Sequence, residues 1–185
     1  MAPTLLPTPP PTLPPTDRPL PTDPPTDPPV DPPTDGPAPT DAPSSVTTAE
    51  RQVTFTWATN PGDPDRDMVD ELVLLTQAYL QDRLRTEFGD TLPDLTYTIP
   101  DGTRVSDGTT QRIVTFPPGT VEFAGTVGFD PEASINAVII SALETNNGAN
   151  YRGTVVENLP ATNIFRTAVS VIPVFRTMSY STDTP

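Results

Sequence analysis

Alternating apolar and polar residues predict the first strand of the folded part. In "QVTFTWA", Val53, Phe55 and Trp57 alternate with threonine and alanine. A period of two places the apolar side chains on one face of a strand. We therefore expect the chain to enter a sheet just after Arg51.

Two later segments show the period of a helix. From Arg66 to Phe88, apolar residues recur every three or four positions, and Gly89 follows. Asp65 or Asp67 is expected to cap the start of this helix. The second segment, "DPEASINAVIISALE", opens with an aspartate cap and a proline in the first turn. Each helix has one apolar stripe with which to cover a sheet.

Four further segments favour strands. They are "LTYTI" at 95–99, "QRIVTF" at 111–116, an alternating run from Val121 to Phe129, and the final "NIFRTAVSVIPVFRT". Asp-Gly turns separate the first two, and Pro117-Pro118-Gly119 precedes the third as a turn or a bulge. Pro173 in the last segment indicates a sheet edge or a bulge.

The order is therefore strand, helix, strand, strand, helix, strand, with one extra strand possible. Two helices on one face of an antiparallel sheet would bury every apolar stripe. The predicted fold class is α+β, with a ferredoxin-like sheet.

The first 50 residues have a different composition, since they contain 18 of the 28 prolines. From Thr22 they repeat Thr-Asp-Pro-Pro with a period of four. Proline fixes φ and restricts the preceding residue, so this segment is expected to be a disordered polyproline II chain. We predict a disordered stalk or linker at 1–50, a domain at 51–180 and a disordered tail at 181–185. The stalk is interpreted either as an inert tail or as a semi-rigid spacer with O-glycosylated threonines.

Charge and composition narrow the function classes. The net charge is -14, every basic residue is arginine, and Cys and His are absent. The acidic chain repels phosphate backbones, so no nucleic-acid partner is expected. Thiol, imidazole and lysine Schiff-base chemistry is excluded, and no cofactor is expected.

Membrane insertion is not expected in this segment. The start "MAPTLLPTPP" lacks the charged and apolar regions of a signal peptide, and the longest apolar runs are too short to span a bilayer.

The stalk also contains a possible ligand motif. In "RPLPTDP", Arg18, Pro21 and Pro24 have the spacing that polyproline-binding domains accept. Asp17 and Asp23 oppose this interpretation, because the pocket for the arginine is usually acidic.

Carboxylates are the remaining candidates for chemistry. Asp63, Asp65 and Asp67 alternate as in a calcium loop, but the glycine and glutamate that an EF-hand needs are missing. A cluster of acids at a helix start is the alternative. A hydrolase would need two converging carboxylates, and the acids at Asp90, Asp94, Asp101 and Asp107 are equally explained as turn formers.

"PPGTVEFAGTVGFD", after a Thr/Pro-rich segment and in a cysteine-free α+β domain, resembles the SEA modules of mucin-type cell-surface proteins. In cleaving members the chain breaks after a glycine, by attack of the next hydroxyl. The resemblance places Gly119 and Thr120 in these roles, although Thr replaces Ser and Glu122 replaces an apolar residue. A weaker similarity is to secreted modules of diatoms and related algae.

These observations favour a non-catalytic interaction or structural module, extracellular or associated with a cell wall, whose partner is a protein or a glycan. One alternative is an intracellular adaptor whose Pro-rich segment is the ligand. Another is an autoproteolytic module or a carboxylate hydrolase.

Overall fold

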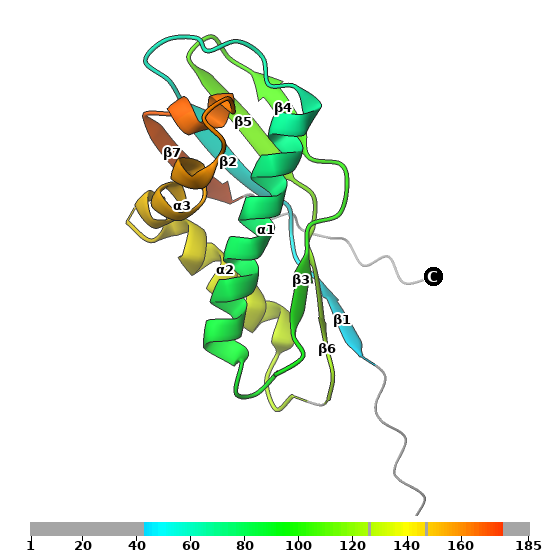
Figure 1. Ribbon diagram of the computed structural model, residues 1–185. Helices are drawn as coiled ribbons and strands as arrows, with labels where there is room; N and C mark the ends of the chain where they lie inside the picture. Colours follow the sequence, from blue (N-terminus) through cyan, green and yellow to red (C-terminus); the bar gives the residue numbers. More distant parts are fainter. Residues whose placement is uncertain (1–42, 126, 147, 176–185) are drawn as a thin grey trace, which may run out of the picture. The chain divides into compact units, whose positions relative to one another are not determined.

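The computed structural model describes residues 43–125, 127–146 and 148–175. They form two antiparallel sheets and three α-helices, so the predicted α+β class is confirmed (Figure 1). Most of the expected stalk, residues 1–42, and the expected tail, residues 181–185, lie outside the described residues.

The larger sheet has the strand order β4-β5-β2-β7. Its strands are β4 (Arg104–Asp107), β5 (Gln111–Phe116), β2 (Arg51–Thr56) and β7 (Ser170–Phe175). Every neighbouring pair is antiparallel, and β2 lies between two strands that follow it in the chain. This is the split βαβ order of the ferredoxin-like arrangement that the sequence predicts.

Three helices lie on one side of this sheet (Figure 1): α1 (Arg66–Phe88), α2 (Pro131–Glu144) and α3 (Ala149–Thr154). The carboxylate of Asp65 caps α1 by accepting the N–H of Met68 at 2.8 Å. Asp130 caps α2 in the same way, through the N–H of Ala133 at 3.1 Å. No helix within the described ranges is both long and apolar enough to cross a membrane.

The smaller sheet has the order β1-β6-β3. Its strands are β1 (Ser44–Thr47), β6 (Thr120–Phe123) and β3 (Thr96–Thr98). β1 lies in the segment that composition assigns to the stalk, so the folded part begins before residue 51. Its pairing with β6 is what holds it there, because β1 has only one half-buried apolar residue, Val46.

The two sheets are consecutive parts of one long ladder, interrupted at Pro117-Pro118. Thr47 lies opposite Thr120 and Arg51 lies opposite Phe116, so the same register continues across the gap. Neighbouring residues of a strand point their N–H groups to opposite sides, so two consecutive prolines remove one donor from each side. The buried face of the strand changes at the break: β5 buries mainly its even-numbered residues, whereas β6 buries its odd-numbered ones.

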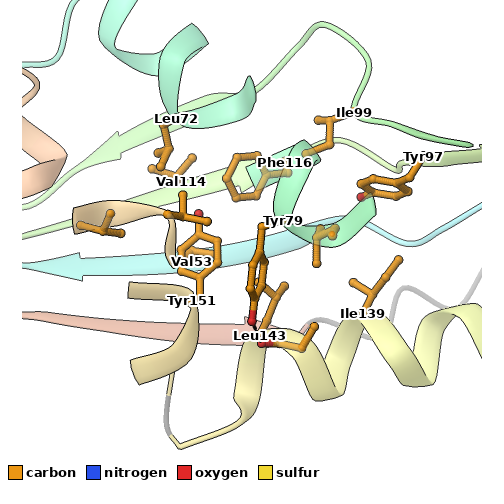
Figure 2. Close-up of a cluster of buried hydrophobic side chains, with 14 of the residues drawn as sticks. Val53, Leu72, Tyr79, Tyr97, Ile99, Val114, Phe116, Ile139, Leu143 and Tyr151 are labelled. Carbon is orange, nitrogen blue, oxygen red and sulfur yellow. Dashed lines mark hydrogen bonds between the residues drawn. The ribbon is translucent and has the colours of Figure 1, made fainter. Parts of the chain in front are cut away.

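The core lies between the helices and the inner faces of the sheets (Figure 2). Val53, Val114 and Phe116 from the larger sheet meet Leu72 of α1, while Ile139 comes from α2. Val53, which the sequence places on the apolar face of its strand, is fully buried, and so are Leu72 and Ile139 within the two helices that the sequence predicts.

The alternating run at 121–129 is only partly a strand. β6 ends at Phe123, and Gly125 then adopts a φ of 98°, a left-handed conformation that turns the chain away. Phe129 packs on Phe88 of α1, with 5.7 Å between the ring centroids. Its position in the alternation therefore reflects contact with a helix.

The final segment also differs from the prediction. It begins with the 3-10 helix η2 (Ile164–Thr167), and β7 starts only at Ser170. A shorter 3-10 helix, η1 (Val156–Asn158), precedes it. Neither β4 nor α3 was predicted as a separate element.

Candidate functional site: a groove between α1 and β4

A groove of about 350 Å³ opens where the first turns of α1 pass the edge strand β4. Its walls also include the residues just before α1 and the loop that joins β3 to β4. Six of the side chains that line it are Asp65, Val69, Asp70, Val73, Asp101 and Val105.

One row of side chains along α1 explains why the groove begins at β4. Farther along the helix, Gln77 and Gln81 bond to the backbone of β3 and its flanking residues. Gln77 accepts the N–H of Ile99 at 2.9 Å, and Gln81 accepts the N–H of Tyr97 and donates to the carbonyl of Leu95 at 2.8 Å. These amides take the place of a neighbouring strand along the edge of β3.

The same row continues at four-residue spacing to Val73 and Val69, which have no hydrogen-bonding side-chain groups. Both valines are half-buried, as is Val105 on β4. The helix therefore forms side-chain hydrogen bonds with the edge of β3 but has no side chain of this kind to offer beside β4. It presents an apolar floor instead.

At Val105, which lines this groove, the backbone of β4 points away from β5. Trp57 donates its N–H to the carbonyl of Thr110 at 3.0 Å, so these two residues form a hydrogen-bonded pair at the end of the β2–β5 ladder. Hydrogen-bonded and non-hydrogen-bonded pairs alternate along an antiparallel ladder, so the N–H and C=O of Val114 point to β2. Val114 and its partner Val105 on β4 are therefore a non-hydrogen-bonded pair, and the N–H and C=O of Val105 point away from β5. Among the described strands, β4 has a neighbour on one side only.

The rim of the groove carries an excess of negative charge. Asp65, Asp70 and Asp101 contribute three carboxylates, and Arg66 contributes one guanidinium. Arg66 lies 3.7 Å from Asp70, but both side chains are exposed, so this pair leaves the groove acidic. The hydroxyl oxygen of Thr103, another lining residue, is enclosed and has no hydrogen-bond partner within the described part of the chain.

The three aspartates considered for calcium have separate surroundings. Asp63 pairs with Arg112, Asp65 caps α1, and Asp67 lies in the first turn of that helix. Across residues 43–125, 127–146 and 148–175, no group of three or more carboxylates is placed to hold a metal ion. Asp65 and Asp67 therefore lie at the helix start, as the alternative interpretation expects, whereas Asp63 does not.

Arg112 joins two loops at one end of the larger sheet. Its side chain is 4% exposed, and it pairs with Asp63 and with Asp107, which are 84% and 81% exposed. It also donates to the carbonyl of Gly62 at 3.0 Å. Asp107 therefore has a structural role here, and Asp101 faces the groove, so these two acids do not form a pair.

Gly119 and Thr120 lie at the junction of the two sheets. The carbonyl oxygen of Gly119 accepts both the N–H of Thr48, at 2.6 Å, and its hydroxyl, at 3.0 Å. A side chain at position 119 would collide with the ring and hydroxyl of Tyr97, which explains the glycine. Thr120 begins β6 opposite Thr47 and Thr98.

Two buried tyrosines have shifted titration. Burial raises the pKa of Tyr97 to about 12, while a hydrogen bond with Thr48 and the charge of Arg51 act in the opposite direction. Burial also raises the pKa of Tyr151 far above its usual range, against a hydrogen bond with Thr76. Both rings belong to the core in Figure 2, so their shifts follow from packing.

A second groove, of about 410 Å³, lies between α1 and α2. Two of its polar side chains, Arg83 and Tyr79, already interact with each other. The guanidinium of Arg83 lies 5.3 Å from the ring centre of Tyr79, whose hydroxyl donates to the carbonyl of Ala142 at 2.7 Å. It lacks the free sheet edge of the α1–β4 groove.

Arg18, Pro21 and Pro24 lie outside the described residues. No protein-family model, curated protein or solved structure matches this chain. The resemblance to SEA modules therefore stays a prediction.

Sequence reasoning missed the α1–β4 groove. Val69 lies within the helix that the sequence predicts from Arg66 to Phe88, and Asp101 is explained there as a turn former; both interpretations are compatible with the structure. The overlooked pattern was "TRVSD", where one valine between polar residues follows an Asp-Gly turn. A single valine gives too little alternation to predict a strand, so this pattern alone does not locate β4.

Proposed function

We propose that this protein is a non-catalytic interaction module, in which an acidic Pro/Thr-rich segment carries a small α+β head at a cell surface or cell wall. The α1–β4 groove carries the proposal. It combines an apolar floor, an acidic rim and an unpaired strand edge, which is a set of features suited to holding a partner.

The location at a surface is supported by composition. A segment with 18 prolines in 50 residues and a Thr-Asp-Pro-Pro repeat has the composition of O-glycosylated spacers of exported proteins. A spacer of this kind would hold the head away from the structure to which it is attached. The partner class is a protein or a glycan.

The test is protease treatment of intact cells that make the protein, followed by mass spectrometry of the released and retained material. The proposal expects release of the head and hexose additions on threonines within residues 1–50. Protection of the whole chain until the cells are lysed, together with unmodified threonines, would contradict the surface location.

The same mass spectra address self-cleavage as a second candidate. The observation that favours it is the pair of hydrogen bonds from Thr48 to the carbonyl oxygen of Gly119, because two donors at one carbonyl would stabilise an oxyanion there. Cleavage would give two fragments that meet at Gly119 and Thr120. A single intact chain would exclude it.

A further inference from the structure

We propose that the α1–β4 groove binds an extended, basic segment of a partner protein, which adds to the larger sheet as a strand beside β4. This inference rests on the proposed function as an interaction module and names the class of partner for its groove. In this arrangement the backbone of β4 forms the hydrogen bonds to the partner, and the valine floor and the acidic rim determine which partner sequences bind.

The first argument is that the edges at β3 and β7 are protected and the edge at β4 is not. Along β3, Gln77 and Gln81 of α1 occupy the hydrogen-bonding groups. At β7, Pro173 lacks an N–H, and Gly148 approaches so closely that a side chain there would lie 2.5 Å from the carbonyl oxygen of Val171. Proteins use such devices to prevent unwanted strand pairing.

β4 does carry charges, but they do not block its edge. Arg104 bonds to Glu50 at 2.9 Å, and Asp107 pairs with Arg112. Neither Arg104 nor Asp107 lines the groove. The N–H and C=O of Val105 are left to pair with an added strand.

The floor selects an apolar residue at the centre of the bound segment. Side chains of an added strand alternate between the two faces of the sheet, so the residue beside Val105 on the inner face points to Val69 and Val73. A branched aliphatic side chain would bury its surface against these three valines. The neighbouring residues of the segment would point to the outer face.

The rim selects positive charge two positions away on either side of that residue. These side chains return to the inner face and come near the carboxylates of Asp65, Asp70 and Asp101. The net charge of -14 on the whole chain adds long-range attraction for a basic partner. We therefore expect the pattern basic, any, aliphatic, any, basic.

A polypeptide fits this groove better than a glycan does. Sugar rings are commonly held against aromatic side chains, and none of the residues that line the groove is aromatic. A strand edge, in contrast, offers the alternating donors and acceptors that a polypeptide backbone matches.

The test is selection from a displayed library of random dodecapeptides against the full chain, followed by affinity measurements on the enriched peptides. We expect enrichment of the basic, any, aliphatic, any, basic pattern. Binding should weaken in salt, because part of the attraction is between exposed charges.

Two variants locate the binding. Val105→Pro removes the N–H that faces the groove and leaves the bonds of β4 to β5 in place, so it should reduce affinity at least tenfold while the far-UV circular dichroism is unchanged. Should Val105→Pro prove unstable, the double variant Asp70→Asn and Asp101→Asn serves instead, because both side chains lie on the rim. It should weaken binding roughly threefold to tenfold. Asp82→Asn, an exposed acid of α1 away from the groove, is the matched control and should bind as the unaltered chain does.

Three results would overturn the inference: no enriched peptides, enrichment without basic residues, or binding that both groove variants retain. Self-association of the chain that Val105→Pro abolishes would also overturn it, since the edge would then belong to a second copy. These outcomes are independent of the surface location, because the binding is measured on the isolated protein. If the peptide-binding test fails but the head is still released from intact cells, only the proposed basic partner is refuted and the surface location stands.

Discussion

Tyr97 shows how one side chain links the two sheets. Its ring packs against Gly119 at the break in the ladder, its backbone N–H is held by Gln81 of α1, and its hydroxyl interacts with Thr48. It thus contacts the connection after β1, the start of β6 and the helix. A phenol in this enclosed position remains protonated at a pH at which an exposed tyrosine would ionise.

We expect the Tyr97→Phe variant to lose less stability at high pH than the unaltered protein. The folded state keeps the Tyr97 proton up to a pKa of about 12, whereas the unfolded chain loses it near 10, the ordinary value. The unfolded state therefore binds fewer protons between these values, and the free energy of unfolding falls with rising pH, by at most about 1.4 kcal/mol per pH unit for this group.

Urea unfolding at pH 8, 10 and 11.5 measures the effect. Below pH 10 the variant should be less stable by about 1 kcal/mol, the value of one hydrogen bond. Above pH 10 the gap should narrow. Phe116→Leu is the control, because a core change without a titrating group lowers stability equally at each pH, and a constant gap for Tyr97→Phe would refute the argument.

At the scale of elements, the two long helices were predictable, whereas the short elements β1, β4 and α3 were not. α1 was predicted with the bounds that it has, because its apolar stripe is long and an aspartate and a glycine lie at its ends. β4 has one half-buried apolar residue, Val105, so its sequence carries no alternation. Its pairing with β5 decides its conformation, and that information is not local.

We expect Asp130→Ala to lower the free energy of unfolding by about 1 kcal/mol. The Asp130 carboxylate accepts the N–H of Ala133, one of the donors at the start of α2 that has no partner inside the helix. Asp130→Asn should keep most of the stability, since its side-chain oxygen can accept the same bond. Thermal unfolding checks both variants, and equal losses for Asn and Ala would show that the charge, rather than the cap, matters.

At the scale of the whole molecule, the groove could not be predicted from local sequence patterns, because its walls come from segments that are distant in the sequence. Its floor combines Val69 and Val73 of α1 with Val105 of β4, which lies more than 30 positions along the chain. The order of strands was predictable from the alternation of elements. The role of the row from Gln81 to Val69 was not, because it depends on which strands lie beside the helix. The same holds for β1, which composition alone assigned to the Pro-rich segment.

The start of the folded unit can be tested by truncation. The chain divides after Ala38, and β1 lies in the unit that follows. A chain that starts at Pro39 should unfold within about 2 °C of the full chain, because β1 and its pairing with β6 remain.

A chain that starts at Arg51 should be less stable by about 3 kcal/mol. It loses the ladder bonds of β1, each worth about 1 kcal/mol, and the bonds from Thr48 to Gly119. It also exposes the backbone of β6, which would favour association through that edge. For a domain of this size the midpoint should fall by roughly 10 °C in calorimetry. Equal midpoints for the two truncated chains would mean that β1 adds nothing to the fold, and that the boundary lies at residue 51 after all.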